Sequence, residues 1–386
     1  MGARLGYGML WSMLFSYPLM AAIQEICGRI GRVTGKGIAG CMRSHYPRWL
    51  LMVVVFMVIV ANVINIGADL AAMGAALSLI MGGPSLLYSF FFAAISTILI
   101  VWIPYTQYVG YLKWMALVLF AYVLTAFVVH VPWGEALRNT VVPTISLSMD
   151  SLTSLTAVLG TTISPYLFFW QSSQEAEEVR NKRDEHALRD APGQAPVQMR
   201  RIRVDTYVGM AFSNLVAYFI ILATAVTLHS GGKFNIGSAA QAAEALRPVA
   251  GSLAFLLFSL GIIGTGLLAL PVLAGSAAYA MSEAVHWPIG LQRKPRQAKA
   301  FYAVLTTAMI IGLTMDLLSF NPISALFLAA IINGLVAAPL MAILMHMASN
   351  PKVMGRFTLS TPLRIVGWVA TGVMLAIAAA LVATLM

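Results

Sequence analysis

Apolar stretches long enough to cross a lipid bilayer recur along the whole chain. A membrane-spanning helix needs about 20 mainly apolar residues. Of the 386 residues, 60% are hydrophobic and only 10% are charged, whereas a water-soluble domain carries about a quarter charged residues. The sequence therefore predicts an all-α polytopic membrane protein. Its ten predicted spans lie near residues 6–26, 50–76, 86–104, 114–132, 152–172, 206–229, 250–280, 301–319, 323–347 and 365–386.

The positions of lysine and arginine predict the orientation of these spans. The loops after the odd-numbered spans hold 20 of these residues, and the opposite side holds 4. Basic loops face the cytoplasm, so both termini are expected on the outside. Almost no residues precede the first span, which fits either a protein with an external N-terminus or a chain that lacks one helix upstream. The charge bias favours the missing helix.

The charges, cysteines and motifs argue against several classes of function. The net charge is +10, but the basic residues flank the spans, so we expect a lipid bilayer and no nucleic acid as partner. Cys27 and Cys41 are too few for a disulfide framework or a thiolate-rich metal cage. The six histidines never pair at helical spacing, and HExxH, GxSxG and phosphate-loop motifs are missing from the sequence. We expect neither an enzyme nor a bound cofactor.

One long polar stretch, residues 173–205, interrupts the apolar pattern on the predicted cytoplasmic side. It begins with acidic residues, ends with basic ones and contains two prolines. We interpret it as a linker between transmembrane residues 1–172 and transmembrane residues 206–386. Its carboxylates are expected to form a solvated run of charge rather than a cation site.

The fifth span contains a predicted helix break, in residues 159–166, which read LGTTISPY. Pro165 removes an amide donor and clashes with the carbonyl group of Thr161, and Gly160 weakens the same turn. Free carbonyl groups beside hydroxyl groups form a set of hard oxygen ligands. Discontinuous helices of this kind mark the substrate site of secondary transporters. A simple proline kink, with its carbonyl satisfied by a neighbouring hydroxyl, is an equal alternative.

Two other spans carry polar side chains at membrane depth. Asn62, Asn65 and Asp69 share one face of the second span, because they are three and four residues apart. An ionisable group inside a membrane is a functional candidate, whereas the two asparagines are expected to form interhelical hydrogen bonds. Asn333 in the ninth span offers an amide oxygen for a cation, or a further interhelical hydrogen bond.

The chain resembles the NRAMP family (natural resistance-associated macrophage proteins), proton-linked transporters of divalent metals. Residues 6–40 resemble the second helix and following loop of that family, and read GYGMLWSMLFSYPLMAAIQEICGRIGRVTGKGIAG. Residues 67–76, GADLAAMGAA, resemble its third helix. Residues 160–178, GTTISPYLFFWQSSQEAEE, lie where its sixth, broken helix is expected. The remaining spans fit its spacing, so the likeness covers the whole chain.

This resemblance implies a LeuT-type fold of two inverted five-helix repeats, followed by an additional C-terminal helix. Residues 1–172 would hold the rest of the first repeat and the broken helix of the second, and residues 206–386 would complete the second repeat. Ten spans that start at the second helix of the family imply that its first helix, with a metal-binding aspartate, is absent here.

The resemblance also implies a divergent cation site. Thr161 takes the position whose carbonyl group binds the metal, and Ser164 takes that of a methionine ligand. Tyr166 replaces a histidine tied to proton movement. Asp69 is kept, while Ala72 stands where a proton-handling glutamate is expected. Oxygen ligands in place of a thioether favour harder cations such as Mg²⁺ or Mn²⁺.

The expected function is transport of divalent metal cations (Mn²⁺, with Mg²⁺ or Fe²⁺ as further candidates) by alternating access, with a link to protons left open. The metal site would comprise Thr161, Ser164 and Asn333, and the proton or ion pathway Asp69 and Tyr166. The expected location is the cytoplasmic (inner) membrane. Two alternatives remain: a LeuT-type carrier of small organic solutes, and an inactive, truncated membrane protein.

Overall fold

The computed structural model describes residues 1–103, 110, 114, 117–144, 148–182, 184–317 and 321–385. All regular elements in this part of the chain are helical. The longer helices are α2 (Leu10–Thr34), α4 (Arg48–Met81), α5 (Ser85–Trp102), α9 (Met149–Thr162), α10 (Pro165–Asn181), α11 (Ala195–Thr224), α14 (Ala254–Val285), α15 (Lys299–Asp316), α16 (Pro322–Ser349) and α18 (Thr361–Leu385). The shorter ones are α1 (Gly2–Leu5), α3 (Ile38–His45), α7 (Phe120–Val128), α8 (Trp133–Val141), α12 (Ala239–Ala243), α13 (Arg247–Ala250) and α17 (Pro351–Met354).

Eight helical segments among the described residues are long and apolar enough to cross a membrane, with α9 and α10 counted as one segment. They match eight of the ten predicted spans. The first predicted span corresponds to α2, which is not one of the eight and carries the polar residues Gln24, Glu25 and Arg29 in its second half. The fourth predicted span falls partly outside the described residues, and its described part holds the shorter apolar helix Leu117–Val128. The chain is an all-helical polytopic membrane protein.

Large apolar side chains cover the outside of these helices. Phe56, Phe90 and Trp102 are each more than half exposed, at 68%, 61% and 72%. An extensive exposed apolar surface is unfavourable in water but suits contact with lipid. The exposed side chains therefore agree with the membrane assignment made from hydropathy.

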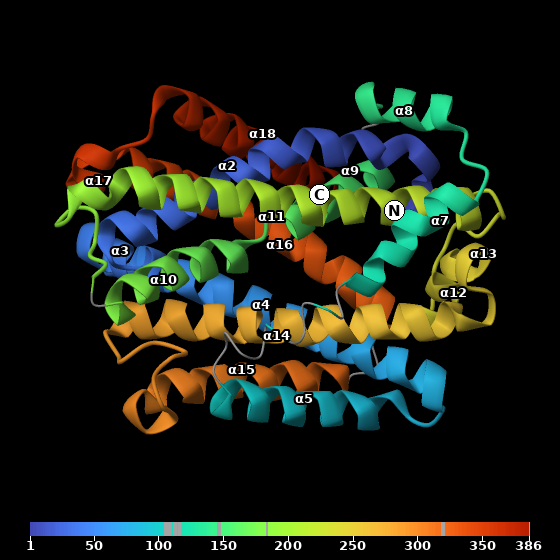
Figure 1. Ribbon diagram of the computed structural model, residues 1–386, viewed down its shortest axis with the longest axis horizontal. Helices are drawn as coiled ribbons and strands as arrows, with labels where there is room; N and C mark the ends of the chain where they lie inside the picture. The colour runs from blue at the N-terminus through green and yellow to red at the C-terminus, as the bar shows by residue number, and fades with distance from the viewer. Residues whose placement is uncertain are drawn as a thin grey trace.

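Helix α14 runs through the middle of the molecule and packs against α4, α10 and α15 (Figure 1). Helices α5 and α15 lie side by side along one edge (Figure 1). Two main apolar clusters form the core, one around α2 and α16 and the other around α4, α14 and α15. Helix α10 contributes Phe168 to the first cluster and Trp170 to the second, so the start of α10 is held from both sides.

The helices cross at small residues. A Cβ atom at Gly160 of α9 would lie 1.9 Å from the carbonyl oxygen of Ala330 in α16, and one at Gly31 of α2 would lie 2.0 Å from that of Ser172 in α10. Close backbone approach at small residues is the usual packing mode in membranes, where burying apolar side chains gives little extra driving force. These crossings fix α9 against α16 and α10 against α2.

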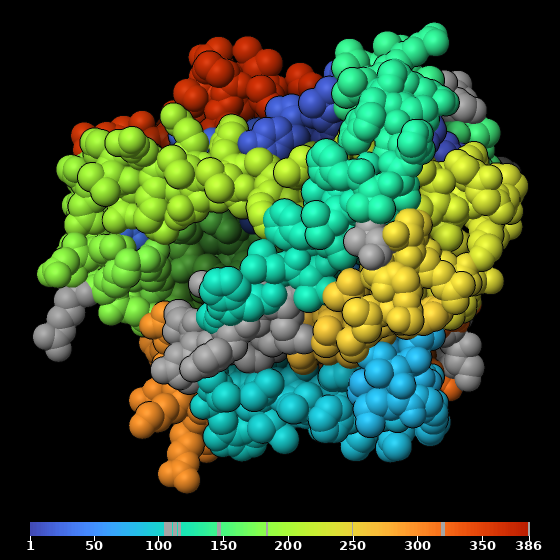
Figure 2. Space-filling model, turned by 45° about the vertical axis from the view of Figure 1, so that its right-hand side comes forward, coloured from blue at the N-terminus to red at the C-terminus, as the bar shows by residue number. Residues whose placement is uncertain are grey.

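The segment that contains α7 and α8 runs across the face of the molecule made by α11 and by residues near 250 (Figure 2). Aromatic contacts attach it to α11: the ring centroids of Phe120 and Phe212 are 5.1 Å apart, and those of Phe127 and Phe219 are 6.0 Å apart. The segment thus covers one side of α11.

The polar stretch interpreted as a linker is mostly helical. Its first residues continue α10 to Asn181 and its last ones belong to α11, so residues 182–194 connect the two helices. The amides of Leu188 and Arg189 donate to the carbonyl oxygens of Arg32 and Val33, which fixes this connection on α2. The expectation of a solvated charge run is wrong for Glu175 and Glu177, which are 6% and 3% exposed. Glu175 pairs with Arg32 and Arg201 from other helices, whereas Glu177 accepts hydrogen bonds from the Tyr279 hydroxyl group and from two main-chain amides, so both burials are compensated by partners far away in sequence.

Candidate functional site

The predicted helix break is present. Helix α9 ends at Thr162 and α10 begins at Pro165, with Ile163 and Ser164 outside helical geometry. Proline is favoured as the first residue of a helix because its missing amide would be unpaired there in any case. The carbonyl groups at the end of α9 carry the negative end of its dipole, which favours a cation. The sequence LGTTISPY therefore creates two half-helices that meet inside one membrane span.

The Ser164 hydroxyl group is within hydrogen-bond distance of two carbonyl oxygens in the last turn of α9. Its Oγ atom is 2.6 Å from the oxygen of Gly160 and 3.0 Å from that of Thr161, and the residue is 1% exposed. This is the proline-kink arrangement in which a neighbouring hydroxyl satisfies a freed carbonyl. One hydroxyl proton can serve one of these acceptors at a time, so lone pairs remain on both carbonyls.

Thr161 differs from Ser164 in its exposure. Its side chain is exposed, and its hydroxyl group donates to the carbonyl oxygen of Ala157 at 2.8 Å. The carbonyl and hydroxyl oxygens of Thr161 are thus acceptors at the break.

The side-chain amide of Asn333 is hydrogen-bonded to that of Asn65. The Asn65 amide donates to Asn333 Oδ1 at 2.8 Å, and the Asn333 amide donates to Asn65 Oδ1 at 3.0 Å. This reciprocal pair joins α4 to α16 and is the interhelical hydrogen bond predicted for Asn65 and predicted as an alternative for Asn333. Asn62, one turn earlier, joins α4 to α14 by donating to the carbonyl oxygen of Leu273 at 3.0 Å.

Asp69 and Tyr166 lie close enough to interact electrostatically, and Tyr166 also interacts with the Ser164 side chain. Asp69 is half-buried, and it forms no ion pair or hydrogen bond with another described residue. Thr161, Ser164 and Tyr166 therefore lie at the break, and Asp69 lies near enough to affect Tyr166 electrostatically. Asn333 is held beside them through α4, because Asn65 is one turn from Asp69.

The chemistry of this site is that of oxygen ligands. Among the described residues no group of three or more His, Cys, Asp or Glu side chains is placed to hold a metal ion. The break instead offers carbonyl oxygens, hydroxyl groups and one nearby carboxylate. Such oxygen ligands suit hard divalent cations more than soft ones.

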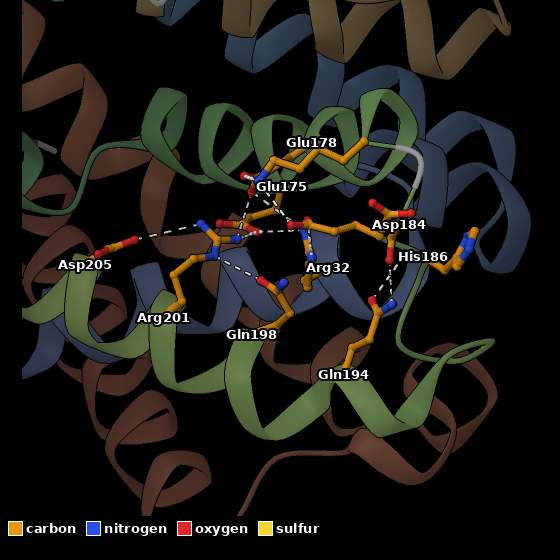
Figure 3. A network of polar contacts seen from close by, with 11 residues as sticks. Arg32, Glu175, Glu178, Asp184, His186, Gln194, Gln198, Arg201 and Asp205 are labelled. Atoms are coloured by element: carbon orange, nitrogen blue, oxygen red, sulfur yellow. Dashed lines mark hydrogen bonds and ion pairs between the residues drawn. The ribbon is translucent and has the colours of Figure 1, made fainter.

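Toward the C-terminal end of α10, away from the break, a network of ion pairs joins α2, α10 and α11 (Figure 3). Arg32 is 0% exposed, pairs with Glu185 and lies 3.6 Å from a carboxylate oxygen of Glu178. Arg201 of α11 lies 2.6 Å from an oxygen of Glu175 and 2.8 Å from one of Glu178. A buried charge is stable only when it is paired, so these residues hold the three helices together.

Two further buried carboxylates attach α10 and α14 to neighbouring loops. Glu177 accepts hydrogen bonds from the Tyr279 hydroxyl group and from the amide of Gln292 at 2.9 Å. Glu283 accepts hydrogen bonds from the amides of Gly37 and Gly40 at 3.1 and 3.0 Å, where α3 begins. A carboxylate at a helix start is favoured by the helix dipole.

Sequence reasoning did not identify Arg32, Glu177 or Glu283 as structural anchors. A signal was present for Glu177, since residues 165–181 continue as one helix and would bring every third or fourth residue to the same face. Arg32 and Glu283 gave no local signal, because their partners lie on other helices.

The comparisons with known proteins agree with this fold. The family model described as natural resistance-associated macrophage protein-like matches residues 1–384. The divalent metal cation transporter MntH of Klebsiella pneumoniae (strain 342) is 24% identical over 386 residues, which cover 97% of this chain and 86% of the relative.

Solved structures show the same architecture. The Eremococcus coleocola manganese transporter superposes with a TM-score of 0.74 at 15% identity, over 98% of this chain and 80% of that one. Mhp1, a nucleobase-cation-symport-1 family transporter in a closed conformation, superposes with a TM-score of 0.56 at 15% identity, over 97% of this chain and 87% of that one. The match of the family model over nearly the whole sequence decides the assignment. The chain belongs to the natural resistance-associated macrophage protein-like family, which is a family of transporters and not of enzymes.

Proposed function

We propose that the protein transports divalent metal cations across the cytoplasmic (inner) membrane by alternating access. The observation that carries this proposal is the break between α9 and α10, where carbonyl and hydroxyl oxygens lie within one membrane span. Half-helices that meet at mid-membrane are the usual cation and substrate sites of secondary transporters. The names of the bacterial relative and of the manganese transporter support a metal substrate, and the bacterial source of the relative supports a location in the cell membrane.

In the proposed mechanism the cation is held by carbonyl oxygens at the end of α9, with the hydroxyl groups of Thr161 and Ser164 beside them. Asn333 contributes its amide oxygen once its hydrogen bond with Asn65 is exchanged for the cation. Asp69 supplies a negative charge on the path to the site, and Tyr166 shares that path as a proton or ion relay. Mn²⁺ is the substrate that best fits both the oxygen ligands and the relatives, with Mg²⁺ and Fe²⁺ as further substrates.

Uptake of Mn²⁺ into proteoliposomes tests this function. Wild-type protein is expected to carry Mn²⁺ faster than protein-free vesicles. Asp69→Asn keeps the shape of the side chain but removes its charge, so we expect the initial rate to fall about tenfold, a loss of about 1.4 kcal/mol.

The matched control is Asp316→Asn, at the end of α15, which should leave the rate near that of wild type. Equal reconstitution of all variants is checked by the amount of protein in the vesicles. If wild-type protein carries no divalent cation at all, the proposal is wrong, and the organic-solute carrier or the inactive protein takes its place. If wild-type protein carries Mn²⁺ and Asp69→Asn carries it at the same rate, the transport function is supported and Asp69 has a packing role.

A further inference from the structure

A basic cavity of about 390 Å³ lies away from the helix break, where the loop after α14 meets α3 and α10. In Figure 1 this is the end of the molecule that carries α3 and α17. Four cationic side chains line the cavity, together with His286 and Trp287; the four are Lys36, Arg43, Arg180 and Arg293. Basic cavities among transmembrane helices bind anionic headgroups.

The positive charge of this cavity is largely uncompensated. Arg180 and Arg293 form no ion pair with a described residue, and Arg43 donates to a main-chain oxygen, that of Glu283, at 2.5 Å. Glu283 is the carboxylate that lines the cavity, and its two oxygens accept hydrogen bonds from the amides of Gly37 and Gly40. Four cations facing one engaged carboxylate leave a net attraction for an anion.

A buried hydroxyl group supplies a second, independent observation. Ser282 lines the same cavity and is 0% exposed, yet its Oγ atom has no hydrogen-bond partner among the described residues. An unpaired buried hydroxyl is costly, and an acceptor oxygen in the cavity would satisfy it.

An apolar groove of about 350 Å³ adjoins the basic cavity. The two share Trp287, which is 43% exposed. The groove is lined by apolar side chains of α4, α14 and α15, including Val63, Met281, Ala303 and Ile311. Ala303 and Ile311 are exposed on a helix that crosses the membrane, so the groove opens toward lipid. Tryptophan is typical of the boundary between headgroups and acyl chains.

We propose that the cavity and the groove together bind one anionic phospholipid. Its phosphate lies among Lys36, Arg180 and Arg293 and accepts a hydrogen bond from Ser282, and an acyl chain follows the groove past Trp287. The continuous apolar groove favours a lipid over a soluble phosphate, which would use the basic cavity alone. The lipid thus contacts residues of α3, α4, α10, α14 and α15 at one end of the molecule.

Native mass spectrometry of the purified full chain tests this site, with dioleoylphosphatidylglycerol and dioleoylphosphatidylcholine as the competing probes. Wild-type protein is expected to retain the anionic lipid about tenfold better. The double variant Arg180→Gln/Arg293→Gln should lose this preference. The control Arg296→Gln/Lys352→Gln removes the same charge from the same end of the molecule, outside the cavity, and should keep it. If the double variant does not elute as folded protein, Arg293→Gln alone, at an exposed side chain, gives the same readout with a smaller loss.

The groove variants separate a lipid from a soluble phosphate. Ala303→Trp fills the groove and should reduce retention of phosphatidylglycerol, whereas Ile310→Trp, on the same helix but outside the groove, should not. Glycerol 1-phosphate at millimolar concentration should fail to displace the lipid. The proposal is overturned if the cavity variants keep the preference for the anionic lipid. It is also overturned if glycerol 1-phosphate displaces the lipid while Ala303→Trp has no effect, because the site would then bind a soluble phosphate.

Discussion

At the scale of single residues, Ser164 sets the chemistry of the proposed cation site. Its hydroxyl group contacts two carbonyl oxygens at the end of α9. A serine oxygen is hard and small, whereas the thioether of methionine is polarizable and attracts softer cations. Mg²⁺ gives up its water reluctantly, and a small side chain leaves room for retained water. Wild-type protein should therefore carry Mn²⁺, tolerate Mg²⁺ and carry Cd²⁺ poorly.

Replacing this serine by methionine tests the selectivity argument. We expect Ser164→Met to raise Cd²⁺ uptake relative to Mg²⁺ by about tenfold, which is about 1.4 kcal/mol of discrimination. The measurement is flux into liposomes with competing cations. Thr153→Met, three turns earlier in α9, is the control and should leave the ratio unchanged. Strong Cd²⁺ uptake by wild-type protein, unaltered in Ser164→Met, would remove Ser164 from the selectivity of the site.

Sequence alone located part of this site. Pro165 and Gly160 predict the break, because their effects on a helix are local. The proximity of Asp69 to Tyr166 and the hydrogen bonds between Asn333 and Asn65 depend on how α4, α10 and α16 pack. Such contacts between distant segments leave no local pattern in the sequence. The sequence therefore could not decide whether Asn333 forms an interhelical hydrogen bond or binds a cation.

At the scale of elements, the crossing of α9 and α16 positions the break. A Cβ atom at Gly160 would lie 1.9 Å from the carbonyl oxygen of Ala330, so Gly160→Ala must push the helices apart. Overpacking of this kind costs about 1–3 kcal/mol. We expect a lower unfolding temperature in detergent and slower Mn²⁺ uptake.

The matched control for this crossing is Gly209→Ala in α11. A Cβ atom there meets nothing within 4 Å, so this change should maintain or slightly raise stability, since alanine favours helix more than glycine does. An equal effect of the two substitutions would show that the crossing does not position the break.

The connection between α10 and α11 adds a dependence on pH. Burial alone would raise the pKa of Glu185, but hydrogen bonds from Arg32 and Lys182 outweigh it and hold the pKa below its ordinary value of 4.5. A carboxyl group with a lowered pKa in the folded state stabilises the fold above its unfolded pKa. That stabilisation is lost as the pH falls through the folded pKa.

We therefore expect Glu185→Gln to lower stability at pH 7 by about 1.5–3 kcal/mol. Below pH 4.5 the difference from wild type should shrink, because wild-type protein then loses the same charge. Thermal unfolding between pH 3 and 7 measures both effects. Asp184→Asn, at an exposed neighbour without an ion pair to a described residue, is the control. A constant difference across this pH range would argue against a role for the Glu185 charge.

The elements themselves were largely predictable. Hydropathy located most of the spans, because the bilayer demands about 20 apolar residues in each. The helical character of residues 173–181 and 195–205 was not predicted, because hydropathy detects lipid contact and not helices that continue into water. Their charges become buried only through partners such as Arg32 on α2.

At the scale of the whole molecule, ion pairs and hydrogen bonds link helices at the end of the structure that carries the basic loops. The network of Arg32 and Arg201 joins α2, α10 and α11, and Glu283 joins α14 to the start of α3. In the proposed mechanism these contacts must break to open the path on this side. Charged groups suit such a closure, since water entering the open state can solvate them again.

The measurement that tests the cation site most directly is protection of an introduced cysteine. Thr161→Cys places a thiol at the break, in protein whose buried Cys27 and Cys41 are replaced by alanine. Mn²⁺ should slow mixed-disulfide formation with a water-soluble methanethiosulfonate, over the same concentrations that saturate uptake. An exposed cysteine elsewhere, Asn235→Cys, should react at a rate independent of Mn²⁺. An unchanged rate of modification at Thr161→Cys, at Mn²⁺ concentrations that saturate uptake, would contradict a cation site at the broken helix.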